Sequence, residues 1–154
     1  VYRIAAELRD LDPSRLAAAA PAGTINADLS ADLRGSALDR ADGRAELRSP
    51  TCGSVVRTDV AIGPDGVVQA LSQRVQACAF GQASAALVAA NAVGRDRDEV
   101  ERALAALAEW LGGGEEPPGW PGMDALEPAR ARPGRHGAIL LPFRALLAAM
   151  GGSK

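Results

Sequence analysis

Apolar and polar residues alternate in the middle of the chain, in segments that predict β-strands. Residues 55–62 and 67–75 both follow a period of two, which is the spacing of side chains on one face of a strand. Between them, residues 63–66 (Gly-Pro-Asp-Gly) suit a four-residue hairpin loop. Residues 45–48 predict a further strand, which matters because an isolated two-stranded ribbon is marginal in water. We therefore expect a three-stranded antiparallel sheet.

After the second hairpin strand the pattern becomes helical. Residues 79–93 are rich in Ala, the best helix former, and are followed by Gly94, a natural residue at the end of a helix. Asp96 and Glu99 have the spacing of a capping box and predict the start of a second helix. The apolar stripe of that helix comprises Val100, Leu104, Leu107 and Leu111.

The remaining segments have weaker patterns. Residues 112–135 are rich in Pro and Gly and predict a long loop, with one helical turn at 124–127. A final helix is expected from 142 to 150. At the other end of the chain, residues 2–9 and 14–20 predict a short helical lead-in, and residues 25–42 predict irregular structure.

These elements together predict an α+β fold, in which a three-stranded antiparallel sheet packs against C-terminal helices after a short N-terminal helical lead-in. The length of 154 residues fits a single domain spanning 1–154. Apolar residues make up 47% and aromatic residues only 3%, so the core must be built mainly from small aliphatic side chains.

Charge and cysteine content exclude several classes of function. A net charge of −2 gives no field that would attract nucleic acid or an anionic membrane. No apolar run approaches the ~20 residues that span a bilayer, and the N-terminal residues lack the apolar core of a signal peptide, so we expect a cytoplasmic protein. Two cysteines in such a protein indicate free thiols, a metal site or redox chemistry rather than a disulfide framework.

The two cysteines occupy distinctive positions. Cys52 precedes the first hairpin strand and is followed by Gly53, which removes side-chain bulk beside the thiol. Cys78 lies between the second strand and the Ala-rich helix, where the helix N-terminus favours a thiolate. Because a hairpin brings the entry of one strand near the exit of the other, the two thiols can lie on the same side of the sheet. The competing interpretation is a pair of inert, buried thiols.

Three motifs carry a resemblance to a known family. They are Pro50-x-Cys52-Gly53-Ser54, then Ala77-Cys78-Ala79-x-Gly81-Gln82-Ala83-Ser84, and then Arg135-His136-Gly137 followed by an apolar run. With the hairpin between the first two, this series resembles the U-type (IscU/NifU/SufU-like) iron-sulfur cluster scaffolds over about residues 45–150. In that family Ser54 corresponds to an Asp and Gly137 to a third cysteine.

The resemblance implies a non-enzymatic assembly protein. Members hold zinc or a [2Fe-2S] cluster with three cysteines and a carboxylate or histidine, so we expect iron, zinc or a [2Fe-2S] cluster here. They accept sulfur from a cysteine desulfurase and pass the cluster to apo client proteins. By resemblance, Cys52, Cys78 and His136 are the expected ligands, with Ser54 as a weak fourth. The family's Leu-Pro-Pro-Val-Lys chaperone segment is replaced here by Leu126-Glu127-Pro128-Ala129-Arg130.

The substitutions at positions 54 and 137 leave alternatives open. Three protein ligands and an open position suit zinc, whereas a [2Fe-2S] cluster normally takes four. A dimer supplying Cys52 and Cys78 from each chain would provide the four thiolates that a cluster needs. We expect a monomer, or a weak dimer of this kind. The rival hypotheses are a degenerate member that binds no metal and regulates the assembly machinery, and a sulfur-relay protein with persulfide on either cysteine. Arg130, Arg132 and Arg135 are candidates for contact with a desulfurase or an acidic client.

Overall fold

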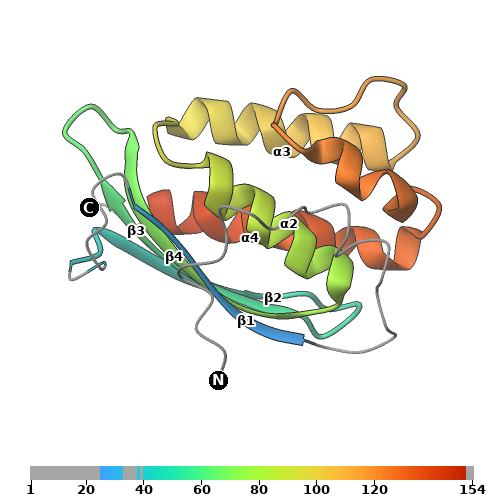
Figure 1. The fold of residues 1–154 in the computed structure, drawn as a ribbon, viewed down its shortest axis with the longest axis horizontal. Helices are drawn as coiled ribbons and strands as arrows, with labels where there is room; N and C mark the ends of the chain where they lie inside the picture. The colour runs from blue at the N-terminus through green and yellow to red at the C-terminus, as the bar shows by residue number, and fades with distance from the viewer. Residues whose placement is uncertain (1–24, 33–37, 39, 152–154) are drawn as a thin grey trace.

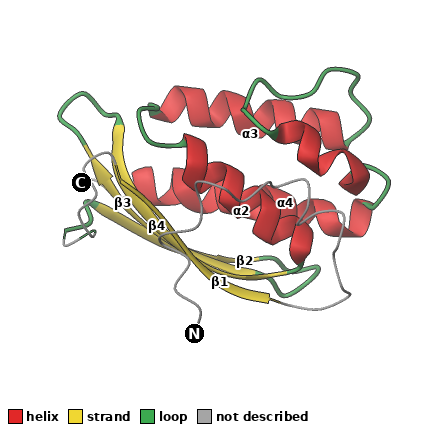
Figure 2. Cartoon of the chain, in the orientation of Figure 1, coloured by secondary structure: helices red, strands yellow, loops and turns green. Residues whose placement is uncertain are grey.

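The fold is α+β, as predicted: an antiparallel sheet is covered on one face by helices (Figures 1 and 2). The computed structural model describes residues 25–32, 38 and 40–151. The predicted helical lead-in at 2–9 and 14–20 lies outside this part of the chain. Within the described ranges, no helix is long and apolar enough to span a membrane.

The three predicted strands are confirmed. They are β2 (Gly43–Arg48), β3 (Val55–Ile62) and β4 (Val68–Ala77). Both β2 and β4 pair antiparallel with β3. The predicted loop closes the β3–β4 hairpin, where the Gly66 N–H donates to the Gly63 carbonyl at 2.9 Å. Gly66 has a φ of 80°, a backbone angle that side chains disfavour.

A fourth strand, β1 (Ile25–Asp32), lies in the segment that we expected to be irregular, so that expectation is wrong for these residues. β1 pairs antiparallel with β4 and gives the sheet the order β1-β4-β3-β2. Its sequence mixes Asp, Asn and Ser with apolar residues and has little intrinsic preference for a strand. Pairing with the edge of β4, which is remote in sequence, overrides that local preference.

Four helical segments complete the fold: α2 (Ala79–Asn91), α3 (Arg97–Leu111), the 3₁₀ helix η1 (Met123–Ala129) and α4 (Pro133–Met150). The predicted capping box of α3 is confirmed, with the Glu99 N–H donating to Asp96 Oδ1 at 2.8 Å and the Asp96 N–H to Glu99 Oε2 at 3.0 Å. The predicted helical turn at 124–127 is the middle of η1.

Helix α4 begins at Pro133, well before the predicted start at residue 142. Proline lacks the N–H that a helix interior uses, so it is disfavoured inside a helix. In the structure Pro142 lies inside α4, whose neighbouring residues Ile139, Phe143 and Leu146 are fully buried. The Pro142 carbonyl accepts a hydrogen bond from Gln73 Nε2 of β4 at 3.3 Å. Tertiary packing therefore sustains a helix that proline alone would interrupt.

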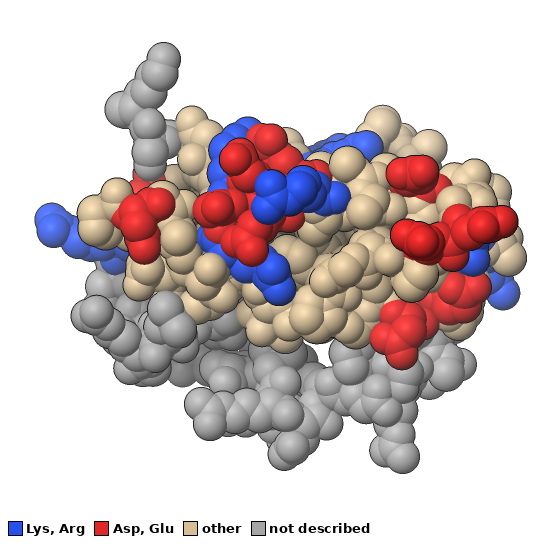
Figure 3. All heavy atoms as spheres, turned by 90° about the horizontal axis from the view of Figure 1, so that it is seen from above, with Lys and Arg blue, Asp and Glu red and all other residues tan. Residues whose placement is uncertain are grey.

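The helices form two layers over the sheet (Figure 1). Helix α4 packs on β2 and β3, α2 packs on β4 and β1, and α3 packs on α4 farther from the sheet. The outer face of α3 presents acidic and basic side chains side by side (Figure 3). Within α3, Arg97 and Glu101 form an ion pair at 2.8 Å. Trp110 and Trp120 are buried in the core and serve packing, as predicted.

Candidate functional site

The two cysteines lie at the same end of the β3–β4 hairpin. Val55, at the start of β3, pairs with Gln76 near the end of β4. Cys52 comes just before Val55, and Cys78 comes just after β4. Both thiols are free and half-buried. The topology therefore brings together the two motifs that the sequence separates.

A tight turn at residues 49–54 presents Cys52. The Gly53 N–H donates to the Ser49 carbonyl at 3.0 Å, and the Ser49 N–H donates to the Ser54 carbonyl at 2.8 Å. Gly53 has a φ of 71°, so its lack of a side chain lets the turn close without strain. Ser54 is buried, and its Oγ lies 3.0 Å from Cys52 Sγ. The residue that corresponds, by resemblance, to the Asp of the U-type scaffolds thus contacts Cys52 directly.

The surroundings of Cys52 favour its thiolate form. Partial burial by itself raises the pKa of the Cys52 thiol. Hydrogen bonds from the Ser49 and Ser54 side chains and from the Ser54 backbone act in the opposite direction and outweigh it, because they stabilise the negative charge. The positive charge of Arg135 adds a further attraction. The net result is a Cys52 pKa below the ordinary value of a thiol.

This pKa can be measured in a Cys78→Ala variant, which leaves Cys52 as the single thiol. The rate of alkylation by iodoacetamide should rise with pH around a midpoint below that of an ordinary cysteine, since only the thiolate reacts. Adding Ser54→Ala should move the midpoint upward, because one donor to the thiolate is removed. An unchanged or lower midpoint in the Ser54→Ala variant would contradict the assignment.

Cys78 is the N-cap residue of α2, as predicted. Its carbonyl accepts the Gln82 N–H at 2.9 Å, and its side chain makes no capping hydrogen bond. The buried Gln82 Nε2 donates to the Val75 carbonyl of β4 at 3.3 Å. The start of α2 is therefore held against the end of the strand that precedes it, which fixes the backbone at Cys78.

The motif Arg135-His136-Gly137 also lies beside the Cys52 turn. Gly137 lies in the N-terminal part of α4, and a Cβ atom added there would lie 3.1 Å from Thr51 Oγ1 and 3.2 Å from Ser49 Oγ. These two hydroxyls are themselves 3.1 Å apart. Position 137 therefore abuts the Cys52 turn. Two hydroxyl groups occupy the space into which a side chain at this position would extend.

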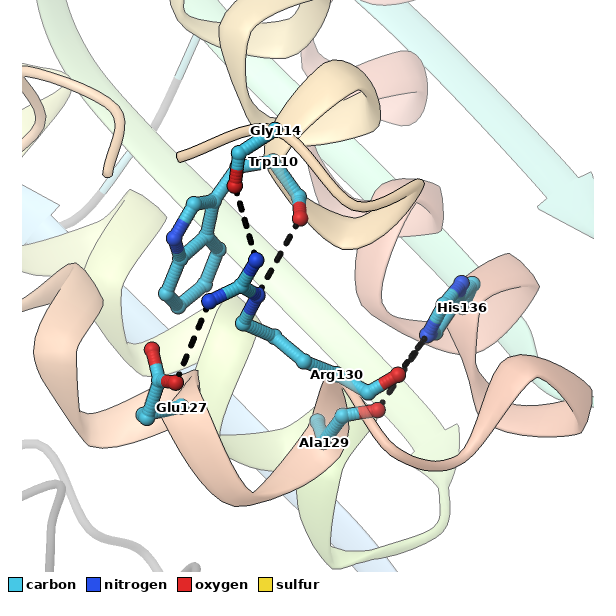
Figure 4. Close-up of polar contacts among 6 residues, drawn as sticks. All are labelled: Trp110, Gly114, Glu127, Ala129, Arg130 and His136. Carbon is cyan, nitrogen blue, oxygen red and sulfur yellow. Dashed lines mark hydrogen bonds and ion pairs between the residues drawn. The ribbon is translucent and has the colours of Figure 1, made fainter. Parts of the chain in front are cut away.

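His136 makes its contacts on the other side, toward η1. Its Nε2 atom lies 3.2 Å from the carbonyl oxygen of Ala129 and 3.2 Å from that of Arg130 (Figure 4). Among the described residues, no three or more His, Cys, Asp and Glu side chains form a group that could hold a metal ion. The ligand set of Cys52, Cys78, His136 and Ser54 stays a prediction.

Sequence reasoning missed Ser49, Thr51 and the role of Arg130. Three hydroxyl residues within the six of the Cys52 turn were a visible signal that the thiol has hydrogen-bond donors. Arg130 gave only part of such a signal: Glu127, three residues earlier, is a local ion-pair partner. The other partners of Arg130, the backbone carbonyls of Trp110 and Gly114, are remote in the sequence. That side chain binds its own chain rather than being free for a partner.

Comparison with solved structures identifies similar folds. The chain resembles the crystal structure of a nitrogen-fixing NifU-like protein (N-terminal) from Brucella abortus, with a TM-score of 0.73 and 29% identity over 95% of this chain and 94% of that one. It shares its fold with a candidate iron-sulfur cluster assembly scaffold for the SUF system from Fervidobacterium islandicum, with a TM-score of 0.60 and 19% identity over 73% of this chain and 82% of that one. No protein-family model and no curated protein sequence matches the chain.

Proposed function

We propose that this chain is a member of the U-type (NifU- and SufU-like) iron-sulfur assembly scaffold family, whose fold it shares, and that it holds iron, zinc or a labile [2Fe-2S] cluster as cargo for client proteins. The observation that supports this most is the placement of Cys52 and Cys78 at one end of the hairpin, with both thiols half-buried. Thiolates are the soft ligands that iron and zinc take in such sites.

The chemistry of the site suits a cargo that must leave again. Cys52 and Cys78 would supply two thiolates, with His136 and Ser54 as further candidate ligands. The hydrogen bonds to Cys52 lower the pKa of its thiol and so favour the thiolate, the form that binds metal. A donor set poorer in sulfur than the family's leaves coordination positions for water, an external thiol or a second copy of the chain. We expect such a cargo to be exchanged readily with an apo client.

The partners proposed for this function follow from the family. A cysteine desulfurase would supply sulfur, and apo proteins would receive the cargo. The chain would act without turnover of its own, as a non-enzymatic scaffold in the cytoplasm. Arg132 and Arg135, which are exposed at the start of α4, are available for an acidic partner surface.

Anaerobic reconstitution with iron, sulfide and reductant tests the proposal directly. The wild-type protein should take up stoichiometric metal with visible absorption from sulfur-to-iron charge transfer, whereas Cys52→Ala should retain much less. Zinc loading and metal analysis should show the same order. Absence of stoichiometric iron and zinc in the wild type would reject the scaffold function. Equal uptake by Cys52→Ala would reject Cys52 as a ligand.

One observation favours the second candidate, a regulatory member that binds no metal. The Ser49 and Thr51 hydroxyls fill the space beside Gly137, where the family's third thiolate begins. A protein whose third ligand position is filled by hydroxyl groups can bind the assembly machinery without binding metal. Under this alternative, the reconstituted protein stays free of metal yet inhibits cluster assembly when it is added to an intact scaffold and desulfurase.

A further inference from the structure

The contacts of His136 determine which of its ring nitrogens carries a proton. Nε2 faces two backbone carbonyl oxygens at 3.2 Å, those of Ala129 and Arg130. A carbonyl oxygen only accepts hydrogen bonds, so Nε2 must be the donor. In the neutral ring, Nδ1 then carries a lone pair. It has no hydrogen-bond partner among the residues that the structure describes.

The two carbonyls are held by the end of η1. The Ala129 carbonyl also accepts the Arg132 N–H at 2.9 Å, and the Arg130 N–H donates to the Glu127 carbonyl at 3.1 Å. Ala129 is fully buried. The acceptor pair is therefore a fixed feature of the turn that joins η1 to α4.

The Arg130 side chain ties this turn to the end of α3 (Figure 4). Its Nε donates to the Trp110 carbonyl at 3.2 Å, and Nη2 donates to the Gly114 carbonyl at 2.7 Å. Nη1 pairs with Glu127 at 3.2 Å, and the guanidinium lies over the Trp110 ring at 5.1 Å from its centre. Every nitrogen of the guanidinium is engaged, so the backbone of residue 130 is anchored on three sides.

We propose that Arg130 is a positioning residue that holds His136 in its Nε2–H form and presents Nδ1 as the nitrogen available to a metal. Ligating histidines commonly donate their other ring N–H to a carbonyl, which sets the tautomer and the ring orientation. The metal part of this inference rests on the proposed function, whereas the tautomer part does not. Figure 4 shows the second ring nitrogen on the side of the ring away from the two carbonyls.

The chain has a single histidine, so ¹⁵N-histidine labelling gives one pair of ring nitrogen signals. In metal-free wild-type protein in alkaline buffer, the spectrum should show protonated Nε2, unprotonated Nδ1 and a slowly exchanging Nε2–H. Arg130→Ala keeps both acceptor carbonyls but removes the side-chain hydrogen bonds that hold their turn. If one such anchoring bond is worth a typical hydrogen bond, exchange of that proton with water should speed up by about fivefold. A wild type with protonated Nδ1 would overturn the inference.

Two further variants separate positioning from general stability. Arg132→Ala removes an exposed guanidinium that makes no hydrogen bond or ion pair with the described residues, and it should leave the exchange rate unchanged. Arg130→Lys keeps the aliphatic stem and one charge but loses the fork, and it should behave like Arg130→Ala while staying folded. Exchange unaltered in Arg130→Lys would show that the arginine does not position the ring.

Zinc titration of the labelled wild type tests the metal part. The Nδ1 signal should shift while the Nε2–H signal persists. A shift at Nε2 with loss of its proton would overturn the inference. If zinc binds nowhere, the proposed scaffold function fails, while the Nε2–H tautomer and its dependence on Arg130 still support the positioning role.

Discussion

Replacing Gly137 with cysteine is expected to raise the zinc affinity of the site by about 100-fold. Structural zinc sites with four ligands bind with roughly 10 to 16 kcal/mol, so one added thiolate contributes roughly 3 kcal/mol, or about two orders of magnitude. Position 137 is the right place, since its Cβ would lie 3.1 Å from Thr51 Oγ1, in the turn that carries Cys52. Competition with a chromophoric zinc chelator measures the change.

A matched control is available in the same helix. Gly134 lies in the first turn of α4, is exposed, and has no heavy atom within 4 Å of an added Cβ. Gly134→Cys adds the same thiol nearby without directing it at the Cys52 turn, so it should leave the affinity within a few-fold of wild type. An equal gain from Gly134→Cys would mean that any nearby thiol suffices. No gain from a folded Gly137→Cys would contradict the proposal that position 137 is where a third cysteine would join the site.

Crowding at position 137 opposes the gain in zinc affinity. A Cβ at 3.1 to 3.2 Å from two hydroxyl oxygens is tighter than ordinary van der Waals contact, so Thr51 and Ser49 must shift by a few tenths of an ångström. Both are small side chains that can rotate about χ1. Combining Gly137→Cys with Thr51→Ala relieves the crowding and should increase affinity further if steric resistance is what limits it.

The sequence predicted the parts of the fold that depend on local signals. The β3–β4 hairpin follows from alternation around a Gly-Pro-Asp-Gly loop, and α3 follows from the Asp96–Glu99 capping box. It did not predict β1, whose ladder is made with a remote strand. It also placed the start of α4 too late, because burial around Pro142 outweighs the proline's local cost.

In the candidate site, too, the features set by local sequence could be predicted and those set by tertiary packing could not. Cys52 and Cys78 could be placed together from the hairpin alone, because strand pairing dictates which ends meet. The contact of Gly137 with the Cys52 turn requires the position of α4, which no local pattern contains. The hydrogen bonds of His136 to the end of η1 depend on a turn whose anchor, Arg130, bonds to backbone carbonyls at and just after the end of α3. Every residue has a backbone carbonyl, so the sequence does not indicate which carbonyls accept these hydrogen bonds.

The position of α4 depends in turn on Gly43, and we expect Gly43→Ala to destabilise the protein by about 3 kcal/mol or more. A Cβ at this buried position in β2 would fall on the Ala149 carbonyl of α4, far inside van der Waals contact. Overpacking typically costs about 1 to 3 kcal/mol, and the upper end applies because the obstructing atom belongs to a helix backbone rather than to a side chain that can rotate. Urea denaturation followed by circular dichroism measures the loss.

Gly119→Ala is the matched control for this effect. That glycine is exposed, has an ordinary backbone angle and has no heavy atom within 4 Å of an added Cβ, so alanine should leave stability unchanged or raise it by up to about 1 kcal/mol. A Gly43→Ala protein as stable as wild type would show that α4 can move away from β2 at little cost. If α4 could move in this way, the short distance between Gly137 and the Cys52 turn would not be fixed either. Gly137 is part of α4, and Gly43 contacts the same helix at Ala149.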